Sequence, residues 1–215
     1  MKRLVIFDLD GTLLNTIADL AASTNQALRH FCYPEHPTEA YRFFVGNGIN
    51  KLFERALPES ERTEENVLRI RSKFIPYYNE HNADFSTPYP DIPEVLHILQ
   101  EHGLMLAVAS NKYQLATEKL IAHYFPTIRF VKVLGQREGI PVKPDPTIVN
   151  DILKIAHVSK EEVLYVGDSG VDMQTAINAG VDAVGVTWGF RPRTELEPLK
   201  PLGLIDKAKE LLTYI

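Results

Sequence analysis

The sequence predicts an α/β fold in which a doubly wound parallel sheet carries an inserted all-α module. Two patterns predict it: short runs of branched apolar residues alternate with helical patterns, and one long stretch after the first run carries only helical signals. A chain of 215 residues, 45% of them hydrophobic, is long enough for one full core with an inserted smaller module.

The expected strands and helices follow one another in regular alternation. The strands are expected at 3–7, 104–109, 130–134, 163–167 and 183–187, and the helices at 92–102, 113–123, 146–156, 170–179 and 203–214. Pro93 near the start of the first of these helices and Gly103 just past its end are typical of helix termini. Alternation of this kind favours parallel strands with helices on both faces of the sheet.

The long gap between the first two strands is the exception. Residues 15–85 carry helical patterns only, near 15–30, 38–44, 48–57 and 61–81. A single crossover does not need so many residues. We therefore predict a core of residues 1–14 and 86–215 with a helical cap at 15–85. The chain would cross between them near 14–17 and 83–88, and a cap beside the loop after the first strand is placed to act as a lid.

Composition excludes several classes of function. A net charge of −5 with scattered basic residues gives no basis for binding nucleic acid. No apolar stretch approaches the roughly 20 residues of a membrane span, and the single cysteine, Cys32, fits a reducing compartment. We expect a cytoplasmic protein with no membrane partner and leave its oligomeric state open. The Gly-Asp-Ser-Gly at 167–170 is interpreted as a chance likeness to serine proteases, because it follows a strand and opens a helix.

The most informative segment is Leu4-Val5-Ile6-Phe7-Asp8-Leu9-Asp10-Gly11. It reads as a buried strand that ends in two carboxylates two residues apart. In extended backbone these side chains would point to opposite faces, so they converge only where the chain turns, and Gly11 permits such a turn. Two buried like charges are unfavourable without a cation between them. The pair therefore predicts a metal site, although two turn-forming aspartates are the simpler alternative.

Polar residues also follow the other expected strands, at the edge where a doubly wound sheet binds ligands. They are Ser110, Asn111, Lys143, Asp168 and Asp172. Each has a structural alternative: a helix cap for the serine, a surface position for the lysine, and a helix start for the two aspartates. Together they answer one chemical need, because oxygen ligands suit Mg²⁺ while a lysine and a serine can hold a phosphate.

These segments resemble the haloacid dehalogenase superfamily with a helical cap after the first strand. Its four motifs occur in order as Asp8-Leu9-Asp10-Gly11-Thr12, Ser110-Asn111, Lys143-Pro144 and Gly167-Asp168-Ser169-Gly170-Val171-Asp172. The resemblance spans the whole chain. It implies a Rossmann-like core with strand order 3-2-1-4-5 and Asp8 at the point where the strand order reverses.

The resemblance also implies a mechanism. Asp8 would be the nucleophile that forms an aspartyl-phosphate, Asp10 the general acid and base, and Lys143 the cation that stabilises the transferring group. The implied Mg²⁺ site comprises Asp8, Asp10 through its backbone carbonyl, Asp168 and Asp172, the last directly or through water. The implied phosphate ligands are Thr12, Ser110 and Asn111.

Asp10 narrows the subclass, because dehalogenases and phosphonatases of this superfamily lack an acid there. The segment Gly46-Asn47-Gly48 before an amphipathic helix resembles the cap of phosphoglycolate phosphatases, as does Thr187-Trp188-Gly189-Phe190. A helix start attracts anions, so Gly46, Asn47 and Gly48 are candidate substrate contacts, with an interhelical turn as the alternative. The expected function is a Mg²⁺-dependent phosphatase for 2-phosphoglycolate or a related small phosphorylated metabolite. A pyrophosphatase, a sugar-phosphate phosphomutase and a non-catalytic module that binds a phosphorylated ligand are the alternatives.

Overall fold

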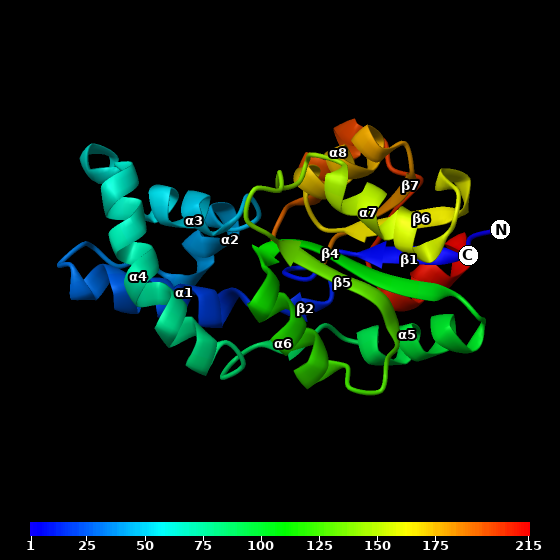
Figure 1. The fold of residues 1–215 in the computed structure, drawn as a ribbon, viewed down its shortest axis with the longest axis horizontal. Coiled ribbons are helices and arrows are strands. Elements are labelled where there is room, and N and C mark those ends of the chain that lie inside the picture. The colour runs from blue at the N-terminus through cyan, green and yellow to red at the C-terminus, as the bar shows by residue number, and fades with distance from the viewer.

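The computed structural model describes residues 1–215 and shows an elongated molecule with helices at one end and a sheet at the other (Figure 1). The strands are β1 (Leu4–Phe7), β2 (Leu14–Asn15), β3 (Thr87–Pro88), β4 (Met105–Tyr113), β5 (Phe130–Gln136), β6 (Val163–Gly167), β7 (Asp182–Val186) and β8 (Gly203–Ile205). Six of them form one parallel sheet in the order β5-β4-β1-β6-β7-β8. For the five expected strands this is the predicted order 3-2-1-4-5, which is confirmed.

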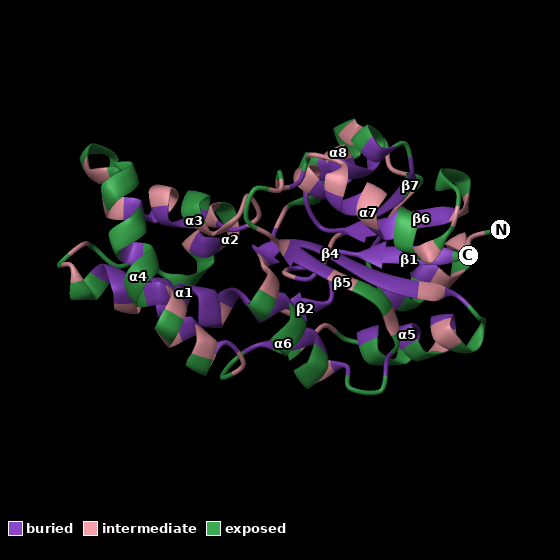
Figure 2. Cartoon of the chain, viewed as in Figure 1, coloured by how far each residue is buried: buried purple, intermediate pink, exposed green.

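Helices cover both faces of this sheet (Figure 1). They are α5 (Ile92–Glu101), α6 (Gln114–Tyr124), α7 (Thr147–Ala156), α8 (Gly170–Ala179) and the short α9 (Arg193–Leu196). Alternate residues of β1 divide between two cores: Val5 and Phe7 pack toward α5 and α6, while Leu4 and Ile6 pack toward α7 and α8. This is the period of an extended strand buried on both faces, and Figure 2 shows the strands as the buried layer.

The stretch between β2 and β3 is helical, as predicted. It contains α1 (Ile17–His30), α2 (Tyr41–Phe44), α3 (Ile49–Ala56) and α4 (Glu64–His81), with short 3-10 turns at Thr38–Ala40 and Glu59–Glu61. We call residues 17–81 the helical segment. Its helices bury a third cluster of apolar side chains that includes Leu52, Phe53 and Phe74, and the hydroxyl of Thr63 caps the start of α4.

The two crossings between the sheet and the helical segment lie side by side. Leu14 and Asn15 pair antiparallel with Pro88 and Thr87, a ribbon that the sequence pattern did not predict. Behind it the buried Asp19 of α1 accepts hydrogen bonds from the backbone N–H groups of Phe85 and Ser86 and from the Ser86 hydroxyl, at 2.6–3.2 Å. Each of these strands has only two residues, which is too short for a recognisable strand pattern in the sequence.

Two expectations about element boundaries are wrong. The expected helix at 203–214 is the sixth strand, β8, followed by a 3-10 helix at Ala208–Tyr214, because Gly203–Ile205 pairs in parallel with β7. The second expected strand does not end at 109. It continues as β4 to Tyr113, and α6 therefore begins at Gln114. None of the helices is long and apolar enough to cross a membrane.

Candidate active site

The loop after β1 carries the first two aspartates to the carboxyl edge of the sheet. The Asp8 N–H donates to the carbonyl of Val166 on β6 at 2.9 Å, so this residue continues the sheet. Beyond it the chain turns at Gly11, whose φ of +89° is favourable only for glycine. The N–H of Gly11 closes the turn on the Leu14 carbonyl at 2.9 Å. The predicted turn is thus confirmed in its local geometry.

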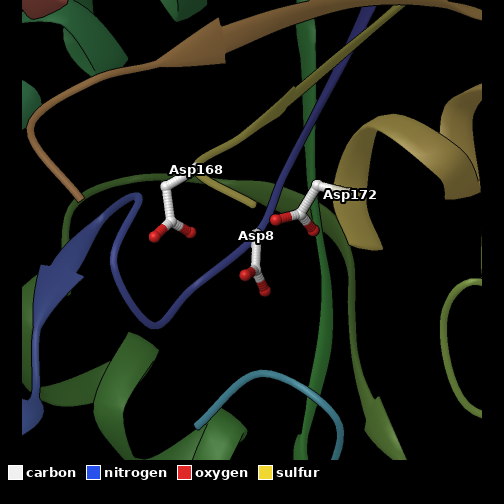
Figure 3. Close-up of side chains that lie close together, drawn as sticks. All are labelled: Asp8, Asp168 and Asp172. Atoms are coloured by element: carbon white, nitrogen blue, oxygen red, sulfur yellow. The ribbon is translucent and has the colours of Figure 1, made fainter. Parts of the chain in front are cut away.

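Three carboxylates from separate segments meet at this edge. Asp8 follows β1, Asp168 follows β6, and Asp172 lies in the first turn of α8, and one oxygen from each lies within 4.8 Å of the others (Figure 3). All three are buried. Such a set of hard oxygen donors is chemically suited to a divalent cation such as Mg²⁺.

Lys143 is the only ammonium among these carboxylates. Its Nζ lies 2.7 Å from Asp172 Oδ1, 2.9 Å from Asp8 Oδ1 and 3.1 Å from the Tyr165 hydroxyl. Burial alone would lower the pKa of this lysine, but the charges of Asp172 and Asp8 outweigh burial and raise the pKa well above its ordinary value. The ammonium is therefore permanently charged at neutral pH.

One ammonium does not neutralise three carboxylates. Burial, followed by repulsion from Asp172, raises the pKa of Asp8 from 3.8 to about 7. Burial and the same repulsion raise the pKa of Asp168 well above its ordinary value. The site as built from protein atoms alone therefore lacks positive charge, which a bound cation would supply.

Hydrogen bonds and close packing fix the orientation of the two later aspartates. Asp168 accepts from the Phe190 N–H at 2.7 Å and from the Thr12 hydroxyl at 3.3 Å. Asp172 Oδ2 accepts from the Ser169 hydroxyl at 2.6 Å and from the Ser169 N–H at 3.1 Å, and the second bond completes the capping box of α8. A Cβ on Gly11 would lie 2.3 Å from Asp168 Oδ2, and one on Gly167 would lie 2.3 Å from the Cβ of Asp172. Glycine is required there for the carboxylates to fit.

The side chain of Asp10 is not part of the carboxylate cluster. Its Oδ1 accepts from the Thr16 hydroxyl at 2.6 Å, and its Oδ2 lies 3.0 Å from Lys112 Nζ. With each oxygen held by a different partner, the carboxylate of Asp10 has a defined orientation. It lines the same pocket as Asp8.

The three predicted phosphate ligands, Thr12, Ser110 and Asn111, differ in their hydrogen-bond partners and in whether they line the pocket. Ser110 lines the pocket, and its hydroxyl accepts only the Lys112 N–H, at 3.2 Å, so its own proton is available to a ligand. Asn111 is fully engaged: its side chain bonds the backbone N–H and carbonyl of Lys143 and donates to the Gly46 carbonyl at 2.9 Å. Thr12 hydrogen-bonds Asp168 and does not line the pocket.

The pocket lies between the edge of the sheet and the helical segment. Its polar side comprises Asp8, Asp10, Ser110, Asn111 and Lys112, and its other side comprises Leu20, Val45, Gly46, Gly48, Ile49, Leu52, Phe74, Tyr78 and Tyr113. Asn47 lies outside this lining, because Arg55 binds its side-chain oxygen at 2.8 Å. The loop Gly46–Gly48 thus reaches the pocket through its glycines.

Sequence reasoning missed Lys112, Thr16 and Tyr78. Lys112 directly follows Ser110-Asn111, so its position beside a motif was a usable signal. Thr16 and Tyr78 gave no such signal, because a threonine before a helix and an aromatic residue on an amphipathic helix are commonplace.

Comparison with known proteins places this geometry in context. The family model described as haloacid dehalogenase-like hydrolase matches residues 5–186. Phosphoglycolate phosphatases from Haemophilus influenzae (strain 86-028NP) and Vibrio parahaemolyticus are 33% and 32% identical, over 99% of this chain and 98% and 96% of theirs. A crystal structure from Lactobacillus delbrueckii subsp. bulgaricus has a TM-score of 0.92 and 31% identity, with 100% and 99% of the chains covered. Another, described as a "predicted phosphoglycolate phosphatase" from Haemophilus somnus 129PT, has a TM-score of 0.91 and 30% identity, covering 99% and 97%.

Proposed function

This chain belongs to the haloacid dehalogenase-like hydrolase family and is a phosphatase, and we propose that it hydrolyses 2-phosphoglycolate, or a phosphate monoester of similar size, through an aspartyl-phosphate intermediate. The observation that carries the proposal is the buried cluster of Asp8, Asp168 and Asp172 around Lys143, with Asp10 beside it. The full-length likeness to phosphoglycolate phosphatases supports the choice of substrate.

The residues present fit a Mg²⁺ ion. The cluster offers carboxylate oxygens only, it is buried, and it holds more negative charge than Lys143 balances. Asp8 and Asp168 would hold the ion, together with the backbone carbonyl of Asp10, and Asp172 would contact it directly or through water. When bound, the ion supplies positive charge that draws the phosphoryl group to the aspartates.

In the first step a carboxylate oxygen of Asp8 attacks phosphorus, and the bond from phosphorus to the ester oxygen breaks. Lys143 Nζ, 2.9 Å from Asp8, stabilises the charge that spreads over the phosphoryl oxygens. The Ser110 hydroxyl, which has a proton to donate, holds one of those oxygens. Asn111 contributes indirectly by fixing the backbone at Lys143.

Asp10 moves the proton. It gives a proton to the leaving alkoxide, and it later takes one from the water that attacks the aspartyl-phosphate, releasing inorganic phosphate and restoring Asp8. Its hydrogen bonds from Thr16 and Lys112 hold it toward the pocket in both steps. A group that must act twice on different atoms benefits from such a fixed orientation.

We further propose that residues 15–85 form a cap that closes over the substrate. The wall that faces Asp8 is contributed by α1, α3 and α4 and by the loop at Gly46 and Gly48. Two core residues bind this loop: Asn111 donates to the Gly46 carbonyl, and Arg191 donates to the Val45 carbonyl, both at 2.9 Å. Closure of the cap over the pocket would exclude bulk water from the reaction. The exposed single cysteine fits the cytoplasm that we propose as its location.

The test is phosphate release from 2-phosphoglycolate, pyrophosphate, hexose phosphates and ethyl phosphate, with Mg²⁺ and with EDTA. We expect metal-dependent release with 2-phosphoglycolate preferred. Preference for pyrophosphate would favour a pyrophosphatase, and turnover only in the presence of a sugar bisphosphate would favour a phosphomutase. The absence of release from every ester would contradict the proposal.

The Asp8→Asn variant tests the nucleophile. The amide cannot attack phosphorus, so we expect kcat to fall by about 10⁴-fold or more, with the fold retained in circular dichroism. Trapping with a labelled phosphoryl donor should label the wild type and leave the variant unlabelled. Undiminished turnover in the variant would show that another group attacks the phosphorus.

A further inference from the structure

Lys112 is a buried lysine, and the proposed reaction uses only its contact with Asp10. Its side chain is 3% exposed, near the end of β4, with Nζ 3.0 Å from Asp10 Oδ2 and 4.9 Å from the centre of the Tyr78 ring. Both sides of its backbone are anchored, the N–H on Ser110 Oγ and the carbonyl on the Thr117 hydroxyl, each at 3.2 Å. Its direction into the pocket is therefore built into the fold.

The Lys112 ammonium has more N–H donors than it has acceptors in the protein. It carries three N–H groups, and Asp10 is the only carboxylate within ion-pair distance. The Tyr78 ring face stabilises the positive charge without accepting a conventional hydrogen bond. An anionic group of a ligand can therefore bind Lys112 without displacing Asp10.

No other cation lines the pocket. The wall opposite Lys112 is apolar, with Leu20, Ile49, Leu52 and Phe74 among its side chains. Arg55 and Arg191 lie near this wall, but both donate to backbone carbonyls of residues 43–45 and neither lines the pocket. Apart from the reaction centre, the pocket thus offers a ligand one positive charge and a largely apolar surface that also carries the unpartnered hydroxyl of Tyr78.

We infer that Lys112 binds the carboxylate of a substrate whose carboxylate is attached to the carbon that bears the phosphate ester. This inference rests on the proposed function, in which Asp10 acts on the ester oxygen. Because Lys112 is hydrogen-bonded to Asp10 and lines the same pocket, its ammonium is adjacent to the group that acts on the ester oxygen, within reach of a carboxylate one carbon beyond it. Lys112 is then the residue that determines specificity for 2-phosphoglycolate.

The same arrangement rejects other phosphate esters. Most hydroxyl groups of a hexose phosphate would face the apolar side chains of this wall without hydrogen-bond partners, which disfavours their burial. A neutral leaving group such as ethanol would leave the spare donors of Lys112 without an acceptor. The pocket therefore selects a small anionic leaving group.

The kinetic test compares Lys112→Met with wild type on 2-phosphoglycolate and on ethyl phosphate. The thioether side chain keeps the length and removes the charge, and Lys119→Met, at an exposed position of α6, is the matched control. We expect the ratio of kcat/KM values for the two esters to fall by about 30-fold or more, chiefly through the KM for 2-phosphoglycolate. Equal losses on both esters, confined to kcat, would show that Lys112 serves only to position Asp10 and would overturn the inference.

A binding measurement separates this inference from the proposed function. In the Asp8→Asn background with Mg²⁺, calorimetric titration with 2-phosphoglycolate and with inorganic phosphate needs no turnover. We expect Lys112→Met to lower the affinity for 2-phosphoglycolate by about 30-fold and the affinity for inorganic phosphate by much less. If wild type does not hydrolyse 2-phosphoglycolate but this difference is found, the proposed substrate fails and the carboxylate site stands. If Lys112→Met changes both affinities equally, the carboxylate site fails whatever the enzyme hydrolyses.

Discussion

Lys143 and Lys112 are two buried lysines, one paired with Asp8 and the other with Asp10, and their surroundings differ. Lys143 forms ion pairs with both Asp8 and Asp172 and donates a hydrogen bond to the Tyr165 hydroxyl. Lys112 has one carboxylate and the face of an aromatic ring. Burying an ammonium is unfavourable in either place, and each is balanced by protein carboxylates, two at Lys143 and one at Lys112. The difference shows that one lysine completes the reaction centre whereas the other is left for the ligand.

Of the two lysine variants, Lys143→Met is expected to have the larger effect on stability and turnover. Removing the ammonium leaves the Asp8 and Asp172 carboxylates buried without a cation, which we expect to lower the free energy of unfolding by about 3–5 kcal/mol in the absence of metal. Turnover should fall by about 10³-fold or more on every ester alike. Urea unfolding and a panel of esters measure the two effects. A loss confined to carboxylate-bearing esters would exchange the roles assigned to the two lysines.

The pH dependence of folding stability reports on the Asp8 carboxyl that faces Lys143. Because the pKa of Asp8 is raised from 3.8 to about 7 in the folded protein, the folded state binds a proton more tightly than the unfolded state. Without metal, stability should therefore fall as pH rises from about 4 to 7, by up to about 4 kcal/mol from this group.

Asp8→Asn removes this penalty, because the amide does not ionise. Denaturant titrations in EDTA should show that the free energy of unfolding of the variant rises relative to that of wild type between pH 4 and 7. Above that range the difference should stay constant. Mg²⁺ should then stabilise wild type more than the variant at pH 8. A stability difference that is independent of pH would contradict the raised pKa.

The smallest effect concerns the packing around the cluster. Gly11→Ala introduces a Cβ 2.3 Å from Asp168 Oδ2 at a φ of +89°, and we expect a loss of about 2–3 kcal/mol and about 10²-fold in kcat. Gly103→Ala is the control: its φ is +80°, but its Cβ meets nothing within 4 Å. The control should lose about 1 kcal/mol and no activity. Equal kinetic losses in both variants would point to backbone strain instead of the carboxylate as the cause.

The sequence predicts the sheet and the helical segment well because both depend on patterns within short windows. The runs at 3–7 and 163–167 are apolar throughout, as strands covered on both faces must be. The strand β8 was mistaken for part of a helix because Gly203–Ile205 has no pattern of its own and exists only through pairing with β7. Its identity as a strand lies in a partner about twenty residues away.

The site residues also fall into two groups: those that a local motif predicts and those that only tertiary contacts define. Asp8, Lys143, Asp168 and Asp172 could be grouped from motifs, and the structure brings them together. Lys112 could not be separated from other lysines, because its contact with Asp10 joins residues 102 positions apart. Asn111, which is predicted to contact phosphate and lines the pocket, also holds the loop at Lys143 and the Gly46 carbonyl through its side chain. Hydrogen-bond partners of this kind depend on tertiary packing and leave no local pattern.

The pairing of β2 with β3 has a consequence for how such a chain can be altered. Leu14 faces Pro88 and Asn15 faces Thr87, so the excursion through the helices leaves the sheet and returns to it at nearly one point. To the sheet, everything between Thr16 and Ser86 is equivalent to a hairpin turn, and the entropy of closing a loop grows only slowly with its length. Helices of another length or shape can therefore be grafted between these two strands while Asp8 and Lys112 keep their places, so the helical wall of the pocket is an exchangeable part of the molecule.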